Sequence, residues 1–212
     1  DNAGCSWHLL MGRIMRPGGV YETRGDSHLH DGLRFSTLRR QQSKLNQLTD
    51  IKKLDGLIKN RKYDEALGLC NLLLEETSTD EHRNLLRKRS HIHSLLGDYQ
   101  QAIDDRLELI GEAQEEADIF FASLCLIRAG KFKDAYRTVN MGIAGLPDTH
   151  TPYTDELIFL RAYALVKLEL YQEAIEVCGH IKDGMKMWVS SFNRPTSKDE
   201  LVNAAEGKSN AI

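Results

Sequence analysis

Histidine and carboxylate side chains gather at one place in this sequence where they could hold a metal ion. His28 and His30 are flanked by Asp26 and Asp31. Two histidines one residue apart point in different directions on a strand or a helix, and no further ligand follows at a regular spacing. We therefore predict a polar loop here and no metal site.

The cysteines show no spacing typical of metal or disulfide chemistry. Cys5, Cys70, Cys125 and Cys178 form no CxxC pair, and the last three fall within apolar helical patterns. Cysteines in such patterns are usually small core side chains. Unpaired cysteines are typical of a reducing compartment, so we predict a cytoplasmic, intracellular protein.

Sequence motifs of the common enzyme classes do not occur. There is no nucleophile elbow, phosphate-binding loop, dinucleotide fingerprint or zinc-protease helix. The pair Gly18-Gly19 follows Arg16-Pro17, which indicates a turn without the strand and helix that a phosphate site needs. We predict no catalytic residue, no cofactor and no enzymatic activity.

Charge is distributed unevenly along the 212 residues, whose net charge is −3. Residues 1–46 carry seven Lys or Arg against four Asp or Glu, and residues 47–182 carry 17 against 23. Nucleic-acid binding requires a concentrated basic face, and residues 47–182 carry an excess of acidic residues instead. The longest apolar run, Ile119 to Ile127, is less than half of a membrane span. We predict neither nucleic acid nor membrane as a partner, and the oligomeric state stays open.

One pattern recurs four times: an aromatic residue followed three positions later by alanine. The pairs are Tyr63–Ala66, Tyr99–Ala102, Phe132–Ala135 and Tyr171–Ala174, with spacings of 36, 33 and 39 residues between the aromatics. Two residues before each aromatic stands Arg61, Gly97, Gly130 or Glu169. We predict that this residue ends a first helix in a tight left-handed turn, that the aromatic begins a second helix and fills the gap between the two, and that the alanine lets them approach closely.

Apolar residues three to four positions apart on both sides of each turn predict the helices themselves. Helix boundaries are indicated by capping residues: a capping box at Ser78 to Glu81 opens a helix that ends near Leu96, and Thr154 opens another. Leu146-Pro147 ends the third pair. A second capping box, Ser197 to Glu200, opens a short helix that Gly207 ends.

These anchors resemble the tetratricopeptide repeat (TPR) over residues 47–182, in degenerate form. The family's first-helix Trp and Leu-Gly positions hold other residues here, such as Leu86 and Ser90. The resemblance implies an all-α, right-handed α-solenoid of about four antiparallel helix pairs, in a domain over residues 37–182. A basic, irregular N-terminal extension (1–36) precedes it and a C-terminal capping segment (183–212) follows. We expect the apolar stretch from Met185 to Phe192 to cover the last pair, the alternative being a partner contact.

The resemblance also implies a concave groove, lined by the first helices, that binds a peptide or a protein. Carried over position by position, the candidate groove residues are Lys59, Arg87, His91, Phe120, Leu124, Arg128, Phe159, Tyr163 and Lys167. Four of them are basic, which predicts a stripe suited to acidic groups of a partner. Cations near the ends of helices also favour the helix dipole, so the alternative is a structural role. The family's clamp for chaperone C-termini is not matched, because His91 and Leu124 hold its asparagine positions.

Three functions are compatible with these features. The first is a non-catalytic scaffold that binds a partner in the groove. The second is an inhibitor of the immunity type that masks a toxin or nuclease with its acidic surface. The third, an enzyme that depends on His28 and His30, has the least support.

Overall fold

The computed structural model describes residues 45–46, 48–77, 79–144, 151–189 and 194–207. The chain divides into two compact units, Asp1–Asn46 and Gln47–Ile212. Several predictions lie outside the described residues: the extension 1–36 with its histidine pair, Cys5, the helix start at Thr37, the capping box at Ser78 and the stop at Leu146-Pro147. All that follows concerns the second unit.

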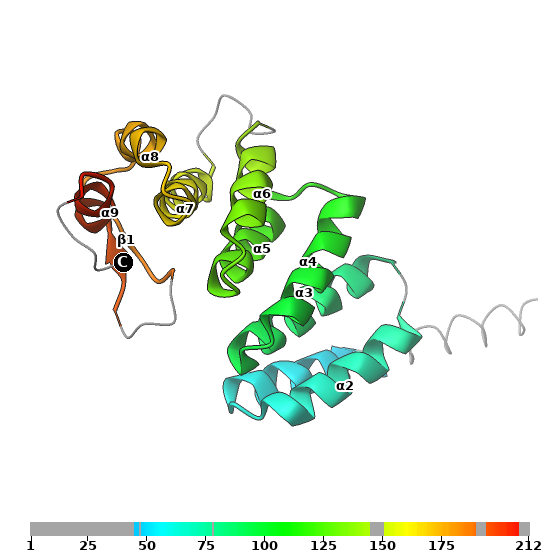
Figure 1. Ribbon diagram of the computed structural model, residues 1–212. Helices are drawn as coiled ribbons and strands as arrows, with labels where there is room; N and C mark the ends of the chain where they lie inside the picture. Colours follow the sequence, from blue (N-terminus) through cyan, green and yellow to red (C-terminus); the bar gives the residue numbers. More distant parts are fainter. Residues whose placement is uncertain (1–44, 47, 78, 145–150, 190–193, 208–212) are drawn as a thin grey trace, which may run out of the picture. The chain divides into compact units, whose positions relative to one another are not determined.

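Helices form most of the described part of this unit. A helical segment over residues 48–59 is followed by α2 (Tyr63–Glu76), α3 (Thr79–Leu96), α4 (Tyr99–Glu112), α5 (Glu116–Arg128), α6 (Phe132–Ala144), α7 (Thr154–Lys167) and α8 (Tyr171–Cys178). Each of α2 to α8 packs against the next along the chain (Figure 1). The predicted pairs are therefore 48–59 with α2, α3 with α4, α5 with α6 and α7 with α8.

The turn inside each pair has the same backbone geometry in all four copies. Arg61, Gly97, Gly130 and Glu169 have φ values of 59°, 86°, 72° and 61°. The next residue donates its N–H to the carbonyl five positions back, at 2.9, 2.8, 2.8 and 3.0 Å. This bond defines the Schellman motif, in which a left-handed residue ends a helix. The predicted turn is confirmed, including the two copies without glycine.

The alanines make the closest contacts within the pairs. Ala66, Ala102, Ala135 and Ala174 are fully buried. Ser90 lies so close to the second helix of its pair that its hydroxyl donates to the carbonyl of Ala102 at 2.9 Å. The aromatics are less buried than predicted: three are half-buried and Tyr171 is exposed, since the first residue of a helix lies at the edge of its pair.

The segment after α8 contains two short strands and a last helix. Strand β1 (Lys186–Met187) pairs antiparallel with β2 (Thr196–Ser197), and α9 (Lys198–Ala205) packs against α8 and α7. The predicted capping box is confirmed, because the Ser197 side chain accepts from the Glu200 N–H and the Glu200 carboxylate accepts from the Ser197 N–H. Gly207, at φ 71°, follows the end of this helix as predicted. The strands were not predicted, since two residues are too few to show alternation.

Two clusters of buried apolar residues hold the unit together. The smaller joins the first pair to α3 through Leu54, Cys70 and Leu85, and the larger extends from α4 to α9. Cys70, Cys125 and Cys178 are buried free thiols, as predicted. In the described part of the chain, every helix is too short or too polar to cross a membrane.

Candidate functional site

The candidate site is the first-helix face, by which we mean the surface of residues 48–59, α3, α5 and α7 that carries the predicted groove residues. Its exposure changes along the chain. Lys59 and His91 in the first two pairs are exposed, and Arg87 is half-buried. Phe120, Leu124 and Arg128 in the third pair are half-buried, and so is Lys167 in the fourth. The face is thus open at its first two pairs.

Phe159 and Tyr163, predicted as groove residues of the fourth pair, are buried. Their exposed fractions are 0% and 3%, and burial raises the pKa of the Tyr163 hydroxyl. Both belong to the cluster that contains Met187 and Val189 from the segment after α8. Contrary to the prediction, these two side chains offer no surface to a partner in this structure, because both are buried in the core.

Residues 185–189, which we name the C-terminal arm, contact the first-helix face through Arg128. The Arg128 guanidinium donates from Nη2 to the carbonyl oxygen of Trp188 at 3.2 Å and from Nε to that of Val189 at 3.4 Å. Side chains alternate along the arm: Met187 and Val189 are buried, whereas Lys186 and Trp188 are exposed. Arg128 therefore binds the chain's own backbone at the position where a partner contact was predicted.

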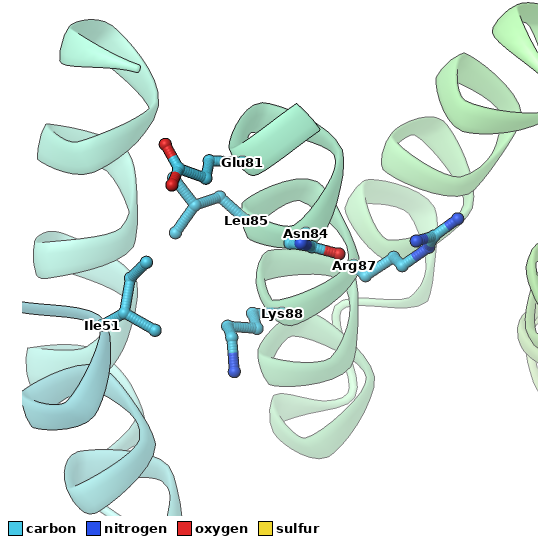
Figure 2. Close-up of a pocket in the computed structure, with 6 residues that line it drawn as sticks. All are labelled: Ile51, Glu81, Asn84, Leu85, Arg87 and Lys88. Atoms are coloured by element: carbon cyan, nitrogen blue, oxygen red, sulfur yellow. The ribbon is translucent and has the colours of Figure 1, made fainter. Parts of the chain in front are cut away.

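The open part of the face contains a pocket of about 380 Å³ between residues 48–59 and α3 (Figure 2). The pocket is lined by Ile51, Glu81, Asn84, Leu85, Arg87 and Lys88. Ile51 and Leu85 give it an apolar part, and Lys88 extends from α3 toward the helix that carries Ile51. The Lys88 ammonium forms an ion pair with Asp55 on that helix. The pocket thus offers apolar contact beside a basic group.

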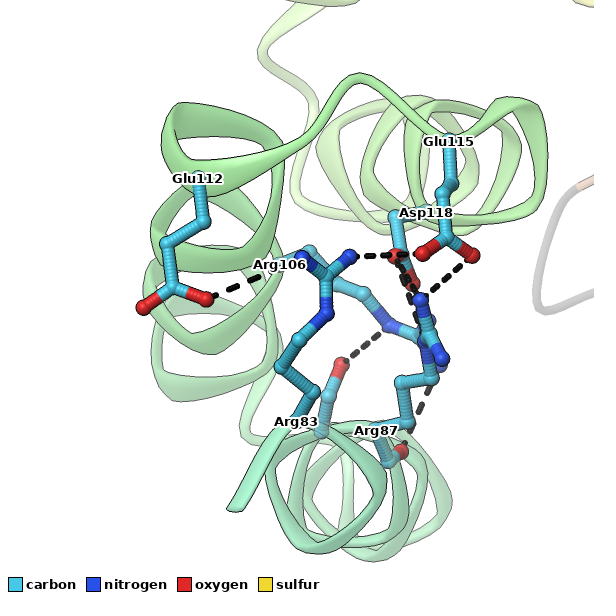
Figure 3. A network of polar contacts seen from close by, with 7 residues as sticks. Arg83, Arg87, Arg106, Glu112, Glu115 and Asp118 are labelled. Atoms are coloured by element: carbon cyan, nitrogen blue, oxygen red, sulfur yellow. Dashed lines mark hydrogen bonds and ion pairs between the residues drawn. The ribbon is translucent and has the colours of Figure 1, made fainter. Parts of the chain in front are cut away.

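A buried ion-pair network joins α3, α4 and α5 next to this pocket (Figure 3). The Asp118 side chain is fully buried and accepts from Arg87 Nε at 3.0 Å and Nη2 at 2.7 Å, and also from Arg106. Arg87 and Arg83 each also bind Glu115, at 2.6 Å. Two arginines on one buried carboxylate satisfy its charge by direct hydrogen bonds, as a charge away from water requires.

The network changes the interpretation of the predicted basic stripe. Its hydrogen bond with Asp118 raises the pKa of Arg87, whereas burial lowers the pKa of Arg106 despite the same carboxylate. Arg87 thus links α3 to α5. Lys167 lies over the Tyr163 ring, with its Nζ 5.6 Å from the ring centroid. Most of the predicted stripe is therefore engaged within the chain.

Asp118 was missed in the sequence, although a signal was present. This carboxylate stands directly before the run from Ile119 to Ile127, on a helix whose other buried residues are apolar except for Ser123. A charged residue among such residues requires a buried partner of opposite charge. That rule predicts a partner for Asp118 but does not identify it as Arg87 or Arg106.

Neither a cluster of metal ligands nor a thiol with a lowered pKa occurs in the described part of the chain. Over the residues that the structure describes, no three His, Cys, Asp or Glu side chains gather as ligands. Burial raises the pKa of all three described thiols, that of Cys70 to about 11. Such thiols are protonated at neutral pH and are poor nucleophiles.

Comparison with solved structures shows a similar fold in the MamA RS-1 ArsTM double mutant, a TPR protein. The TM-score is 0.55 at 16% sequence identity, over 63% of this chain and 71% of that chain. No family model matches the chain, and no curated protein matches its sequence. At this identity the likeness concerns the fold alone, and with the four equivalent turns it confirms an all-α solenoid of the TPR-like kind.

Proposed function

We propose that this chain is a non-catalytic interaction module that holds a segment of a partner protein on the open part of the first-helix face. The main support is the change in burial along that face. The fourth pair buries Phe159 and Tyr163, whereas His91 and Lys59 in the first two pairs are exposed. A pocket lies between residues 48–59 and α3. Pockets with an apolar part and a few polar groups are the usual sites of ligand binding.

The pocket favours a partner segment that combines an apolar side chain with a carboxylate. Ile51 and Leu85 supply the apolar contact. Within the described residues, Lys88 forms an ion pair with Asp55, whose side chain is exposed. Surface ion pairs contribute about 0–1 kcal/mol, so a partner carboxylate can replace Asp55 at little cost. Lys59, exposed at the end of the same helix as Asp55, adds a second positive charge.

The experiment is a selection of peptides from a random display library against the intact chain. Selected peptides should combine apolar and acidic residues. Their affinity, measured by fluorescence anisotropy, should fall at least tenfold for the double variant Lys59→Glu, Lys88→Glu. Reversal of Arg87 or Arg128 is unsuitable, since both hold internal contacts.

The matched control is the double variant Lys131→Glu, Lys133→Glu, which makes the same charge change at two exposed positions at the start of α6. This variant should bind the selected peptides with unchanged affinity. Equal losses in both variants would indicate a nonspecific charge effect, and no loss in the double variant would refute the proposed site.

A further inference from the structure

The C-terminal arm lies on the first-helix face as a bound peptide would. It is extended at β1 and turns at Trp188, where the Val189 N–H donates to the Met187 carbonyl at 3.1 Å. Among the residues that the structure describes, Arg128 on α5 donates to two backbone oxygens of the arm, those of Trp188 and Val189. Contacts to backbone oxygens do not depend on the side chains of the bound segment, so the same arginine can bind any extended chain placed there. Sequence specificity then comes from the two buried side chains, Met187 and Val189.

The arm belongs to a loop that is closed at its base independently of the face. The Lys198 ammonium donates to the Ile181 carbonyl and to the Asp183 carboxylate, both at 2.7 Å, which joins the chain before the arm to the start of α9. Leu201 and the capping box hold α9 itself. The arm can therefore leave the face while its base stays in place.

Few backbone bonds hold the arm within its own loop. Strands β1 and β2 pair over only two residues each. Outside the strands, the Lys198 N–H donates to the Met185 carbonyl and the Met185 N–H to the Lys182 carbonyl, both at 3.2 Å. Gly184, at φ 76°, lies between the base and the arm. Segments with few bonds open locally at a lower free energy than the folded unit.

We propose that the arm occupies a second binding surface, on α5 and α7, in the position that a partner peptide takes when the arm leaves. The ligand is an extended peptide with apolar side chains at alternate positions, in the pattern of Met187 and Val189. The arm and the ligand compete for Arg128 and for the same apolar contacts. This inference rests on the proposed function, because it assigns a regulated surface to the same face.

The first test is hydrogen exchange on the intact, unmodified chain. The amides of residues 187–189 should exchange at least tenfold faster than those of Phe159 and Tyr163, although Met187 and Val189 belong to the same cluster as these two residues. Equal rates would show that the arm opens only when the helices do, and would overturn the proposal.

The second test uses a fluorescent peptide with the sequence of residues 183–189 as the probe. In the full-length chain, Val189→Asp places a charge on the buried side of the arm, whereas Lys186→Asp changes its exposed side. The probe should bind the Val189→Asp chain at least tenfold more tightly than it binds the Lys186→Asp chain or the unmodified chain.

Two outcomes would overturn the proposal: no binding to the Val189→Asp chain, or loss of helical circular dichroism in that chain, which would make the arm part of the core. The milder variant Met187→Ala, which removes an apolar contact of the arm and leaves Arg128 in place for the probe, should also increase probe binding. Peptides selected for the open pocket should bind the Val189→Asp chain unchanged. This separates a failure of the arm proposal from a failure of the proposed function.

Discussion

The four turns allow a quantitative test of how backbone conformation determines stability. Arg61 and Glu169 hold the left-handed conformation that Gly97 and Gly130 hold in the other two pairs. A left-handed conformation costs a residue with a Cβ about 1–2 kcal/mol. Glycine avoids this cost but loses about 0.5–1 kcal/mol more in chain entropy on folding. Each change to glycine should therefore stabilise its pair by about 0.5–1 kcal/mol.

The perturbation is the double variant Arg61→Gly, Glu169→Gly. Its two contributions together should be about 1–2 kcal/mol. A chain of this size gains about 2–4 °C in unfolding midpoint per kcal/mol, so the midpoint should rise by about 2–8 °C. The assay is thermal unfolding followed by circular dichroism at 222 nm, which reports the helices.

The opposite change supplies the control. A Cβ on Gly97 or Gly130 would have no atom within 4 Å, so alanine there adds only backbone strain and should lower the midpoint. Gly68 in α2 is equally free of neighbours but has no positive φ. Gly68→Ala should therefore raise the unfolding midpoint, because alanine has a higher helix propensity than glycine. A fall in the midpoint for the double variant, or the same sign for all three alanine changes, would refute the reasoning.

Three further predictions concern the core. Asp118→Asn leaves two arginines without their buried carboxylate and should destabilise the chain by about 3–5 kcal/mol in urea unfolding; a loss under 1 kcal/mol would contradict a structural role of the network. Gly142→Ala places a Cβ 2.8 Å from Cγ2 of Ile119 and should cost about 1–3 kcal/mol in the same assay, unlike Gly68→Ala. Because burial raises the pKa of Cys70 from 9.0 to about 11, the neutral thiol's contribution to stability is complete below pH 9 and is lost between about pH 9 and 11. At pH 8, iodoacetamide should then label Cys70 only in urea, as mass spectrometry would show; rapid labelling of the native chain would contradict its burial.

The candidate site was only partly predictable, for a reason visible in particular residues. The resemblance placed Lys59, His91 and Phe159 on one face by their positions within helices. It did not indicate which of these positions a distant segment would cover. Phe159 is buried in a cluster that also contains Val189, thirty residues later, and nothing in the local sequence of α7 indicates that the two share a core.

The sequence alone determined the helices, the four turns and the buried alanines. These features depend on interactions among residues close in the chain, such as apolar spacing, the left-handed residue and the cap, which local residue types specify. The tertiary structure decided which charges are free and which part of the first-helix face is open. Asp118 and Arg87 are 31 positions apart in the sequence, and Arg128 is 60 and 61 positions from the two arm residues that it binds. Such contacts form only when the packed helices bring these residues together.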